Sequence, residues 1–355
     1  MAITEILFRV DCDSEIGGGH LSRCIALAQR VKKKSHFPRF ILYGDIKAKN
    51  ILSNYGFSFI QGAARTINDQ INELKKFDLQ GKIVIADFIN YKYLLKPNEL
   101  FKLISAWQQE TSIFALIDGG FNQSARKILK SLPVDVLIAP YFNEIALKNA
   151  PYLQLIGEKY FIFNNAYKQV TKKVIAKNAN KILVTCGNSD PLMISECILS
   201  SLNKINVPLE IKLIEGQLFN EELKFSIHRL ASLSHHQVEI IKAPKVLYRE
   251  MQWSDLAIST SGLTKYELAL TGTPMISISI DFEHEEVNKN FLKQGTSISL
   301  GCFDKDNTSD LIVANVLEIL INYERRAKMS KTGQDLFDAH GADRVLREIL
   351  NLSNL

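Results

Sequence analysis

A histidine that directly follows three glycines is the feature of this sequence with the clearest chemical potential. Gly17, Gly18 and Gly19 precede His20, and Arg23 follows within one helical turn. Glycines let the backbone adopt positive φ and approach a ligand closely. A helix that begins here offers unpaired N–H groups to an anion, and an imidazole can act as a general base at neutral pH. We therefore predict that this loop binds an anionic ligand and that His20 acts on it.

A second loop of this type lies in the other half of the chain. Gly187, Asn188, Ser189 and Asp190 follow an apolar segment that ends at Cys186. Gly187 frees the backbone, and Ser189 or Asp190 is suited to cap the helix that follows. The same N–H groups are suited to a phosphate. The sequence leaves both roles open.

A third loop combines hydroxyl groups and a glycine at a helix start. Ser261, Gly262, Leu263 and Thr264 follow an apolar segment, and Glu267 lies in the first turn of the helical pattern behind them. Successive N–H groups in such a loop form an anion-binding nest. Glu267 is either a surface carboxylate favoured by the helix dipole or a bidentate acceptor for a ribose diol. Three loops of the phosphate-binding type favour a phosphate-containing ligand.

Strand-like and helix-like segments alternate along the chain, which is typical of parallel α/β folds. Two such series are present, and each is long enough for a doubly wound sheet. The expected strands are Ile6–Cys12, Phe40–Tyr43, Ser58–Ile60, Lys82–Asp87, Ile113–Asp118 and Asp135–Ala139 in the first series, and Lys181–Cys186, Leu209–Ile214, Val238–Ile241, Leu256–Ser259, Met275–Ile280 and Ser297–Ser299 in the second.

The boundary between the two series is a lysine- and asparagine-rich stretch with a weak core pattern. We predict two doubly wound, Rossmann-type domains with a cleft between them. The N-terminal domain is expected over residues 1–167, a linker over 168–180 and the C-terminal domain over 181–355. The last helix, Gly341–Leu350, is a candidate to reach back to the first domain.

Polar residues and glycines stand at the expected carboxyl ends of the strands, where ligands bind in such folds. Asp11, Asp87 and Asp118 end strands of the first series, and Gly187 and Ser261 follow strands of the second. We expect all of these turns to face the ligand.

Length and composition restrict the function classes. The 355 residues are 46% hydrophobic and 23% charged, with a net charge of +5. The composition is typical of a globular protein. The modest net charge fits an acidic ligand and a generic protein surface equally well, and it does not require nucleic acid. No run approaches the roughly 18 apolar residues of a membrane span. The first strand follows the N-terminal methionine closely, so we expect no leader sequence, a cytoplasmic location and a monomer.

The five cysteines are scattered and are not spaced as metal ligands. They are interpreted as buried apolar groups in a reducing compartment. No clustered spacing of histidine, aspartate or glutamate indicates a metal. We expect neither a metal nor a cofactor.

Taken together, these segments resemble the UDP-sugar hydrolases of pseudaminic acid biosynthesis, which release UDP from UDP-2,4-diacetamido-2,4,6-trideoxy-β-L-altropyranose. That family is related to spore-coat polysaccharide proteins and shares the GT-B fold with the murein glycosyltransferase. The similarity extends over nearly the whole chain. It is carried by Arg9–Asp11 with Ile16–Cys24, by Val84–Phe88, by Leu155–Tyr160, by Ile182–Pro191 and by Asp255–Glu267.

The resemblance implies that His20 is the catalytic base and that Glu267 holds the ribose of UDP. Asp11 or Asp13 is then a candidate to orient the His20 ring, and Asp87 a candidate to bind sugar hydroxyls or amides. A single displacement by water at the anomeric carbon would invert its configuration. We expect substrate contacts from Gly17, Gly18, Gly19, Arg23 and Asp118, and nucleotide contacts from Gly187, Asn188, Ser189, Asp190, Ser261, Gly262, Leu263 and Thr264.

Two segments depart from the family pattern. Asp118 is followed by two glycines where the family carries a second acidic residue, and the usual Asn-Gln pair is missing after Asp281, where His284 and Asn288 are candidate replacements. Both departures concern the sugar side of the site. The alternatives are a glycosyltransferase with a UDP-sugar donor, an inactive UDP-sugar-binding protein and a nucleotide-sugar epimerase.

Overall fold

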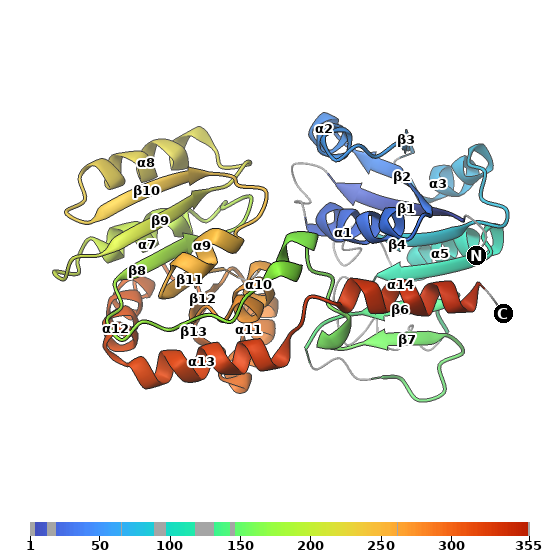
Figure 1. Ribbon diagram of the computed structural model, residues 1–355. Helices are drawn as coiled ribbons and strands as arrows, with labels where there is room; N and C mark the ends of the chain where they lie inside the picture. Colours follow the sequence, from blue (N-terminus) through green and yellow to red (C-terminus); the bar gives the residue numbers. More distant parts are fainter. Residues whose placement is uncertain are drawn as a thin grey trace. The chain divides into compact units, whose positions relative to one another are not determined.

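The computed structural model describes residues 4–12, 19–64, 66–88, 97–117, 131–142, 146–260 and 262–353. The chain forms two compact units (Figure 1). Unit 1 comprises Met1–Asn165 and Ala339–Leu355, and unit 2 comprises Ala166–Asp338. Each unit is described by itself.

Unit 1 is built on a seven-stranded sheet whose hydrogen-bonded neighbours are all parallel. The order along the sheet is β3-β2-β1-β4-β5-β6-β7. The strands are β1 (Glu5–Cys12), β2 (Phe37–Gly44), β3 (Phe59–Gln61), β4 (Ile83–Asp87), β5 (Ile113–Ile117), β6 (Val136–Ala139) and β7 (Leu153–Ile156).

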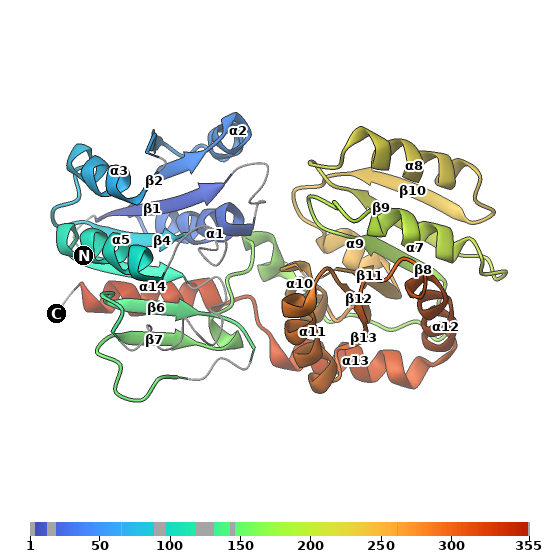
Figure 2. The ribbon, with the colours of Figure 1, turned by 180° about the vertical axis from the view of Figure 1, so that it is seen from behind.

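Alternation along each strand of unit 1 separates two cores, because successive side chains point to opposite faces. Phe8 and Val10 of β1 lie in the core on the side of α1 (Gly19–Lys33). Leu7 faces the other core, which contains Leu103 and Trp107 of α5 (Pro97–Glu110). Helix α1 is at the front of the sheet in Figure 1, and α5 with α3 (Ile67–Glu73) is at the front in Figure 2. Helix α2 (Ile46–Asn54) adds Ala48 and Leu52 to the α1 side.

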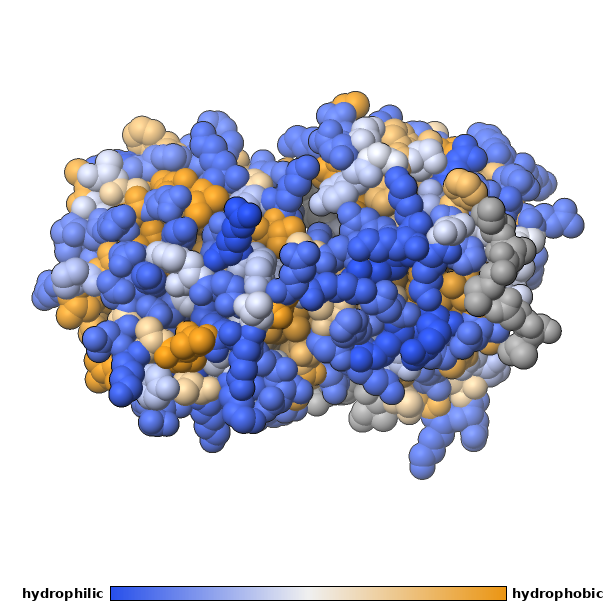
Figure 3. Space-filling model, in the orientation of Figure 1, coloured by the Kyte–Doolittle hydropathy of each residue, from blue (hydrophilic) through white to orange (hydrophobic). Residues whose placement is uncertain are grey.

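The last helix, α14 (Gly341–Leu352), packs within unit 1 against α1. Its Val345, Leu346 and Ile349 are buried in the α1-side core, whereas its outer surface is hydrophilic (Figure 3). A Cβ on Gly341 would lie 2.1 Å from the carbonyl oxygen of Phe161, so this close approach requires glycine. The C-terminal domain expected over residues 181–355 therefore ends before α14, and this helix belongs to unit 1, in line with its candidate return to the first domain. Its apolar stripe fits the α1 side of that sheet.

Unit 2 repeats the strand order of unit 1 without the seventh strand. Its six parallel strands run β10-β9-β8-β11-β12-β13. The prediction of two doubly wound parallel sheets is therefore confirmed. The strands are β8 (Lys181–Thr185), β9 (Glu210–Glu215), β10 (Gln237–Lys242), β11 (Leu256–Ser259), β12 (Met275–Ser279) and β13 (Ser297–Cys302).

Helices cover both faces of the unit 2 sheet. Helices α7 (Ile194–Leu202), α8 (Glu221–Ser232) and α12 (Thr308–Ile321) bury apolar residues with one face (Figure 2). Helices α9 (Tyr248–Trp253) and α10 (Thr264–Thr271) contact strands from the other side. Two further helices, α11 (Phe282–Gln294) and α13 (Tyr323–Leu336), pack on β13 and α10 respectively.

Capping residues mark the ends of two helices of unit 2, an aspartate at the start of one and a glycine after each. Asp281 caps α11 by accepting a hydrogen bond from the backbone N–H of His284. Gly272 and Gly295 follow α10 and α11 with φ of 71° and 76°, the left-handed conformation that favours glycine after a helix.

The stretch expected as a linker packs on unit 2. The side chain of Lys173 is buried and donates hydrogen bonds to the backbone carbonyls of Met251 and Gln252. Arg326 of α13 is buried and donates to the carbonyls of Ala176 and Lys177. Burial lowers the pKa of Lys173 to about 8. These two cations attach the segment to the second unit, although its apolar pattern is weak.

Across the described residues, every helix is too short or too polar to be a candidate membrane span.

Candidate functional site

The sheet of unit 1 changes winding direction between β1 and β4, because β1 pairs with β2 on one side and β4 on the other. Ligands in doubly wound folds bind beyond the carboxyl ends of the strands at this point. Asp87 is the last residue of β4 and lies opposite Val10 of β1. Ile83 and Ile85 of the same strand belong to the α1-side core, so Asp87, with the same parity, points toward α1.

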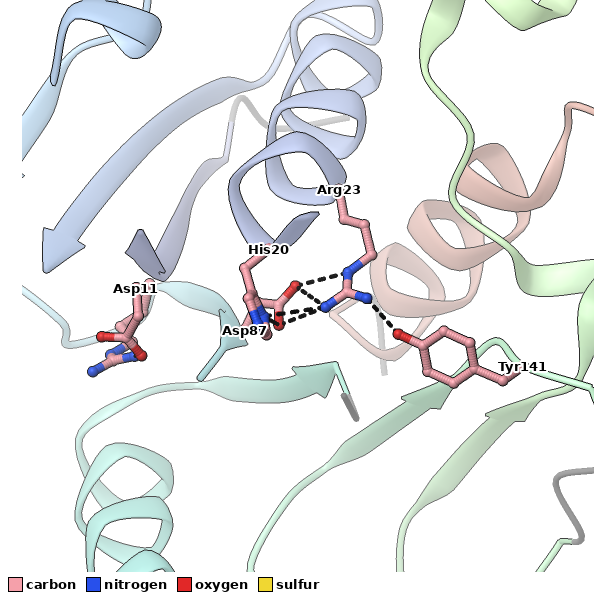
Figure 4. Close-up of polar contacts among 6 residues, drawn as sticks. Asp11, His20, Arg23, Asp87 and Tyr141 are labelled. Carbon is pink, nitrogen blue, oxygen red and sulfur yellow. Dashed lines mark hydrogen bonds and ion pairs between the residues drawn. The ribbon is translucent and has the colours of Figure 1, made fainter. Parts of the chain in front are cut away.

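Helix α1 directs His20 and Arg23 at this carboxylate (Figure 4). Nδ1 of His20 lies 2.6 Å from Oδ1 of Asp87. Arg23 donates from Nε to Oδ2 and from Nη2 to Oδ1, each at 3.0 Å. The side chains of Asp87 and Arg23 are 0% and 6% exposed, whereas that of His20 is 15% exposed. The buried carboxylate of Asp87 thus contacts both His20 and Arg23, and the His20 side chain is the more exposed of these two.

The charge states follow from these contacts. Burial would raise the pKa of Asp87, but Arg23 and His20 outweigh it and hold that pKa below its usual range. Burial likewise opposes the charge on Arg23, but Asp87 and Tyr141 raise the pKa of its guanidinium above the ordinary value. An ionised carboxylate only accepts hydrogen bonds, so the proton of neutral His20 is on Nδ1. Nε2 is then the basic nitrogen.

A fourth residue, Tyr141, joins the group from the segment after β6. Its hydroxyl accepts a hydrogen bond from Nη1 of Arg23, and its ring packs edge-on against Phe161 with centroids 6.4 Å apart. Two sides of the Arg23 guanidinium therefore contact fixed protein groups: Asp87 on one and Tyr141 on the other.

Asp11 lies apart from this group (Figure 4). It pairs with the buried Arg9, whose guanidinium lies 4.5 Å and 4.2 Å from the ring centroids of Tyr43 and Phe88. Phe8, Val10 and Cys12 of β1 face α1, so Asp11, with the opposite parity, faces the other core. The expected orienting contact of Asp11 with His20 is therefore wrong, because Asp87 makes that contact.

Several predicted residues lie outside the described part of the chain. These are Gly17, Gly18, Asp118 and Ser261, together with Asp13. Gly19 is described and is the first residue of α1. The ligand contacts expected of these residues stay predictions.

The loop after β8 in unit 2 is held by the end of β9. Gly187 has a φ of 87°, in the left-handed region. A Cβ on Gly216 would lie within 2.6 Å of the carbonyl oxygens of Gly187 and Asn188, and Leu218 donates its N–H to the Asn188 carbonyl at 2.8 Å. Asn188 and Ser189 are exposed. The loop is therefore braced from behind, with two exposed polar side chains.

Asp190 caps the start of α7 as the local sequence allowed, although it precedes the N-cap residue, Met193, which makes no side-chain capping bond itself. Its two carboxylate oxygens accept the N–H groups of Ile194 and Ser195 at 2.9 and 2.7 Å, at the start of α7. Asp190 is 6% exposed. These two N–H groups are occupied by a carboxylate of the chain itself, so the start of α7 is less suited to a phosphate than the sequence suggested.

The start of α10 differs in this respect. Leu263 is its N-cap and makes no side-chain capping bond, and Gly262 is exposed. Leu263 and Thr264 are half-buried. A helix start of this kind keeps N–H groups for an anion. Strand β11 leads into it and pairs with β8, so it lies at the point where the winding of the unit 2 sheet reverses.

Glu267 lies one turn further along α10 and is half-buried. Desolvation raises its pKa to about 7, although a hydrogen bond from Tyr167 opposes this shift. Tyr167 is 1% exposed and stacks edge-on with Tyr248. The carboxyl group is thus held by a buried phenol and balanced between its neutral and ionised forms near neutral pH.

Lys265 and Asn288 form a buried contact near the start of α10. Nζ of Lys265 donates to Oδ1 of Asn288 at 3.2 Å, and Asn288 donates to the Ser279 hydroxyl at 2.9 Å. Both side chains are almost fully buried, and burial lowers the pKa of Lys265 to about 7. Asn288 therefore connects α11, α10 and β12. His284, the other candidate replacement, is partly exposed and contacts Asp281 at 2.8 Å.

The described residues contain no cluster of three or more histidine, cysteine or carboxylate groups that could hold a metal ion. Unit 1 can instead transfer a proton at Nε2 of His20, and the α10 start of unit 2 can hold an anion.

Sequence reasoning missed Tyr141, Tyr167 and Lys265. Tyr141 follows β6 by two residues, at the ligand end of the sheet, and this position was a usable signal. Tyr167 and Lys265 gave none, because an aromatic residue near a domain boundary and a lysine in a first helical turn are ordinary surface residue types.

Sequence comparison relates unit 2 to a known domain. Residues 181–345 match the model of the glycosyltransferase family 28 C-terminal domain. An uncharacterized protein of Methanocaldococcus jannaschii is 23% identical over 353 residues, which cover 93% of this chain and 68% of that protein. The spore coat polysaccharide biosynthesis protein SpsG of Bacillus subtilis is 27% identical over 203 residues, covering 53% of this chain and 56% of that protein.

Structure comparison defines the fold as GT-B. The crystal structure of MurG from Acinetobacter baumannii matches with a TM-score of 0.67 at 13% identity, covering 98% of this chain and 99% of that one. The UDP-GlcNAc 2-epimerase from Neisseria meningitidis, in a structure with bound UDP-GlcNAc, matches with a TM-score of 0.63 at 14% identity and covers 98% and 100%. The expected fold is therefore confirmed.

Proposed function

We propose that this protein is a UDP-sugar hydrolase that releases UDP by attack of water at the anomeric carbon, with inversion. The observation that carries the proposal is the pair His20–Asp87, in which a buried carboxylate holds Nδ1 of a more exposed histidine at 2.6 Å. This arrangement leaves Nε2 free to accept a proton from water.

The nucleotide is assigned to unit 2. The match to the glycosyltransferase family 28 C-terminal domain, over residues 181–345, covers most of this unit, and a fold relative is described with bound UDP-GlcNAc. We assign the pyrophosphate to the uncapped start of α10, near Gly262, Leu263 and Thr264, and the ribose hydroxyls to Glu267. Gly187, Asn188 and Ser189 are assigned to the same nucleotide.

The chemistry is assigned to unit 1. The bond between the anomeric carbon and the phosphate oxygen breaks, and its electron pair leaves with UDP. The oxygen of water forms the new bond to carbon, and its proton passes to Nε2 of His20. Backbone N–H groups at the start of α10 stabilise the negative charge that develops on the leaving group.

The substrate class rests on the sequence resemblance and on one relative. The resemblance implies a UDP-linked diacetamido-deoxyhexose used for nonulosonic acids of the pseudaminic type, and SpsG is named for spore coat polysaccharide biosynthesis. We therefore place the reaction in polysaccharide biosynthesis, with an acetamido sugar as the substrate.

The test is nucleotide release without an acceptor. The purified protein is incubated with a panel of UDP-sugars and other nucleotide sugars in ¹⁸O-labelled water. We expect UDP release from an acetamido-deoxyhexose donor, with the label on the sugar. Label in the phosphate of UDP would place the attack at phosphorus and refute the mechanism.

A glycosyltransferase is the second candidate, and the family 28 match favours it. The same base would then deprotonate an alcohol instead of water. Release of UDP only after addition of an alcohol acceptor would favour this alternative over hydrolysis.

A further inference from the structure

Arg23 occupies an unusual place for a residue expected to bind substrate. Its Nε and Nη2 atoms donate to Asp87, and its Nη1 atom donates to Tyr141. Nη2 also lies 3.2 Å from Nδ1 of His20. The side chain is only 6% exposed. Its hydrogen-bond donors are therefore directed at the protein rather than at solvent.

The two charges beside His20 have opposite effects on its ring. A carboxylate at 2.6 Å stabilises the imidazolium form, and a guanidinium at 3.2 Å destabilises it. Water screens neither charge well, because Asp87 is fully buried and Arg23 nearly so. Asp87 alone would thus hold the ring in position but also favour its protonation, which would remove the base.

We propose that Arg23 is a positioning residue that keeps His20 neutral: it offsets the charge of Asp87 while leaving the Asp87–His20 hydrogen bond in place. Tyr141 holds the guanidinium from its other side. Asp87 therefore orients the ring, and the positive charge of Arg23 offsets the tendency of Asp87 to protonate it. The kinetic part of this inference rests on the proposed role of His20 as the base, but its protonation part does not.

Within the part of the chain that the structure describes, the other ionisable groups near the ring do not provide this offset. Cys24 is buried on α1, and burial raises the pKa of its thiol well above the ordinary value, so it is neutral. Cys12 ends β1 on the same face and is a buried thiol. Asp11 and Arg9 form their own ion pair on the opposite face of β1. Among the described residues, Arg23 is the cation that contacts both Asp87 and His20.

The test measures the protonation of His20 directly by NMR of ¹³C-labelled histidine, with the signal assigned among the seven histidines by the His20→Gln variant. In Arg23→Gln the titration midpoint of His20 is expected to rise by about one to three pH units. In Asp87→Asn it is expected to fall, because the guanidinium then acts alone. Arg39→Gln, at an exposed position of β2, is the matched control and should not move the midpoint.

Two further variants keep the test decisive if a single buried charge unfolds the protein. Arg23→Lys retains the charge but loses the fork, so the midpoint should rise by less than in Arg23→Gln. Arg23→Gln combined with Asp87→Asn removes both charges, and its midpoint should lie close to that of the wild type. Equal midpoints in wild type and both Arg23 variants, or shifts of one sign in Arg23→Gln and Asp87→Asn, would overturn the inference.

The readout separates this inference from the proposed function. If no nucleotide sugar is hydrolysed but the midpoints move in opposite directions, the proposed reaction fails and the role of Arg23 stands. If hydrolysis occurs, the acidic limb of the pH–kcat profile should move to higher pH in Arg23→Lys. A residue that only supports the fold would lower stability without moving that limb.

Discussion

Both units carry ionisable side chains where the winding of the sheet reverses. The pKa values of these side chains shift in opposite directions in the two units. In unit 1 the pKa of Asp87 is lowered and that of Arg23 is raised, so both are charged. On α10 of unit 2 the pKa of Glu267 is raised to about 7 and that of Lys265 is lowered to about 7. Burial acts on all four groups. In unit 1 the attraction between Asp87 and Arg23 outweighs it, whereas for Glu267 and Lys265 burial has the larger effect.

This difference suits the carboxyl groups of the two units to different roles. A fully compensated carboxylate provides a fixed charge that can orient a base at every working pH. The carboxyl group of Glu267, with a pKa of about 7, is only partly ionised at neutral pH. Hydrogen bonds from hydroxyl groups would stabilise its ionised form, and a ribose diol has two such hydroxyl groups. Unit 1 is thus suited to proton transfer and unit 2 to binding. Because the strand orders agree, side chains rather than topology create the contrast.

The largest effect is expected from removing the base of unit 1. His20→Asn should lower the turnover of UDP-sugar hydrolysis by about a hundredfold to ten-thousandfold, because general-base catalysis contributes factors of this size. UDP affinity should change little, since the nucleotide is assigned to unit 2. Steady-state kinetics and calorimetric titration of UDP measure the two quantities.

The control for this variant is His340→Asn, since His340 lies in α14's N-cap region and is exposed. It should leave turnover unchanged. Weaker UDP binding with retained turnover in His20→Asn would show that the histidine supports the glycine-rich loop and would remove the contrast between the units.

The next effect concerns the lysine of unit 2. The pKa of Lys265 is about 7 in the folded protein and 10.5 ordinarily. Between these values the unfolded chain binds a proton that the folded chain does not, so stability rises with pH there. Lys265→Met should remove a rise of roughly 2–3 kcal/mol between pH 7 and 9. Urea unfolding followed by Trp253 fluorescence in a Trp107→Phe background measures it.

Comparison with the wild type at each pH isolates Lys265 from other titrating groups. Lys289→Met is the control, because Lys289 lies on the neighbouring helix α11 and forms partly exposed ion pairs with Glu285 and Glu286. An unchanged difference between Lys265→Met and wild type from pH 7 to pH 9 would show that the lysine is charged throughout.

The sequence was sufficient for the fold and for part of the site. Hydrophobic runs of strand length and their alternation with helical patterns located both sheets, because buried parallel strands are continuously apolar. Parity also contained the information that Asp87, and not Asp11, faces α1, since Asp87 continues the alternation of Ile83 and Ile85.

Other features depend on contacts between residues that are far apart in the chain, and no local pattern in one sequence indicates such contacts. Tyr141 and Arg23 are 118 residues apart, and Lys173 reaches carbonyl groups about 80 residues away. A polar stretch such as residues 168–180 resembles a linker in composition, yet two buried cations attach it to unit 2. Such contacts decide packing without leaving a periodic signal.

A smaller effect is expected at the ribose position of unit 2. Loss of a charge-assisted hydrogen bond costs roughly 1.5–3 kcal/mol, so Glu267→Gln should weaken UDP binding by about tenfold to a hundredfold at pH 8. The pKa of Glu267 is raised to about 7, so the ionised form that accepts from the ribose is lost as pH falls through 7. The difference between wild type and variant should therefore shrink at pH 6.

Calorimetric titration of UDP at both pH values measures this prediction. Glu286→Gln, an exposed carboxylate on α11, is the control and should bind UDP like the wild type at both pH values. Equal UDP affinity in wild type and a folded Glu267→Gln protein would remove Glu267 from the nucleotide site.

The smallest effect tests where unit 2 holds its anion. Both oxygens of Asp190 accept N–H groups of α7, and loss of such a cap costs about 1 kcal/mol. Asp190→Ala should therefore lower the stability of unit 2 by about this amount in urea unfolding and leave UDP affinity nearly unchanged. Ser189→Ala, at an exposed loop position, should leave stability unchanged. UDP binding that weakens tenfold in Asp190→Ala at wild-type stability would move the phosphate from the start of α10 to the start of α7.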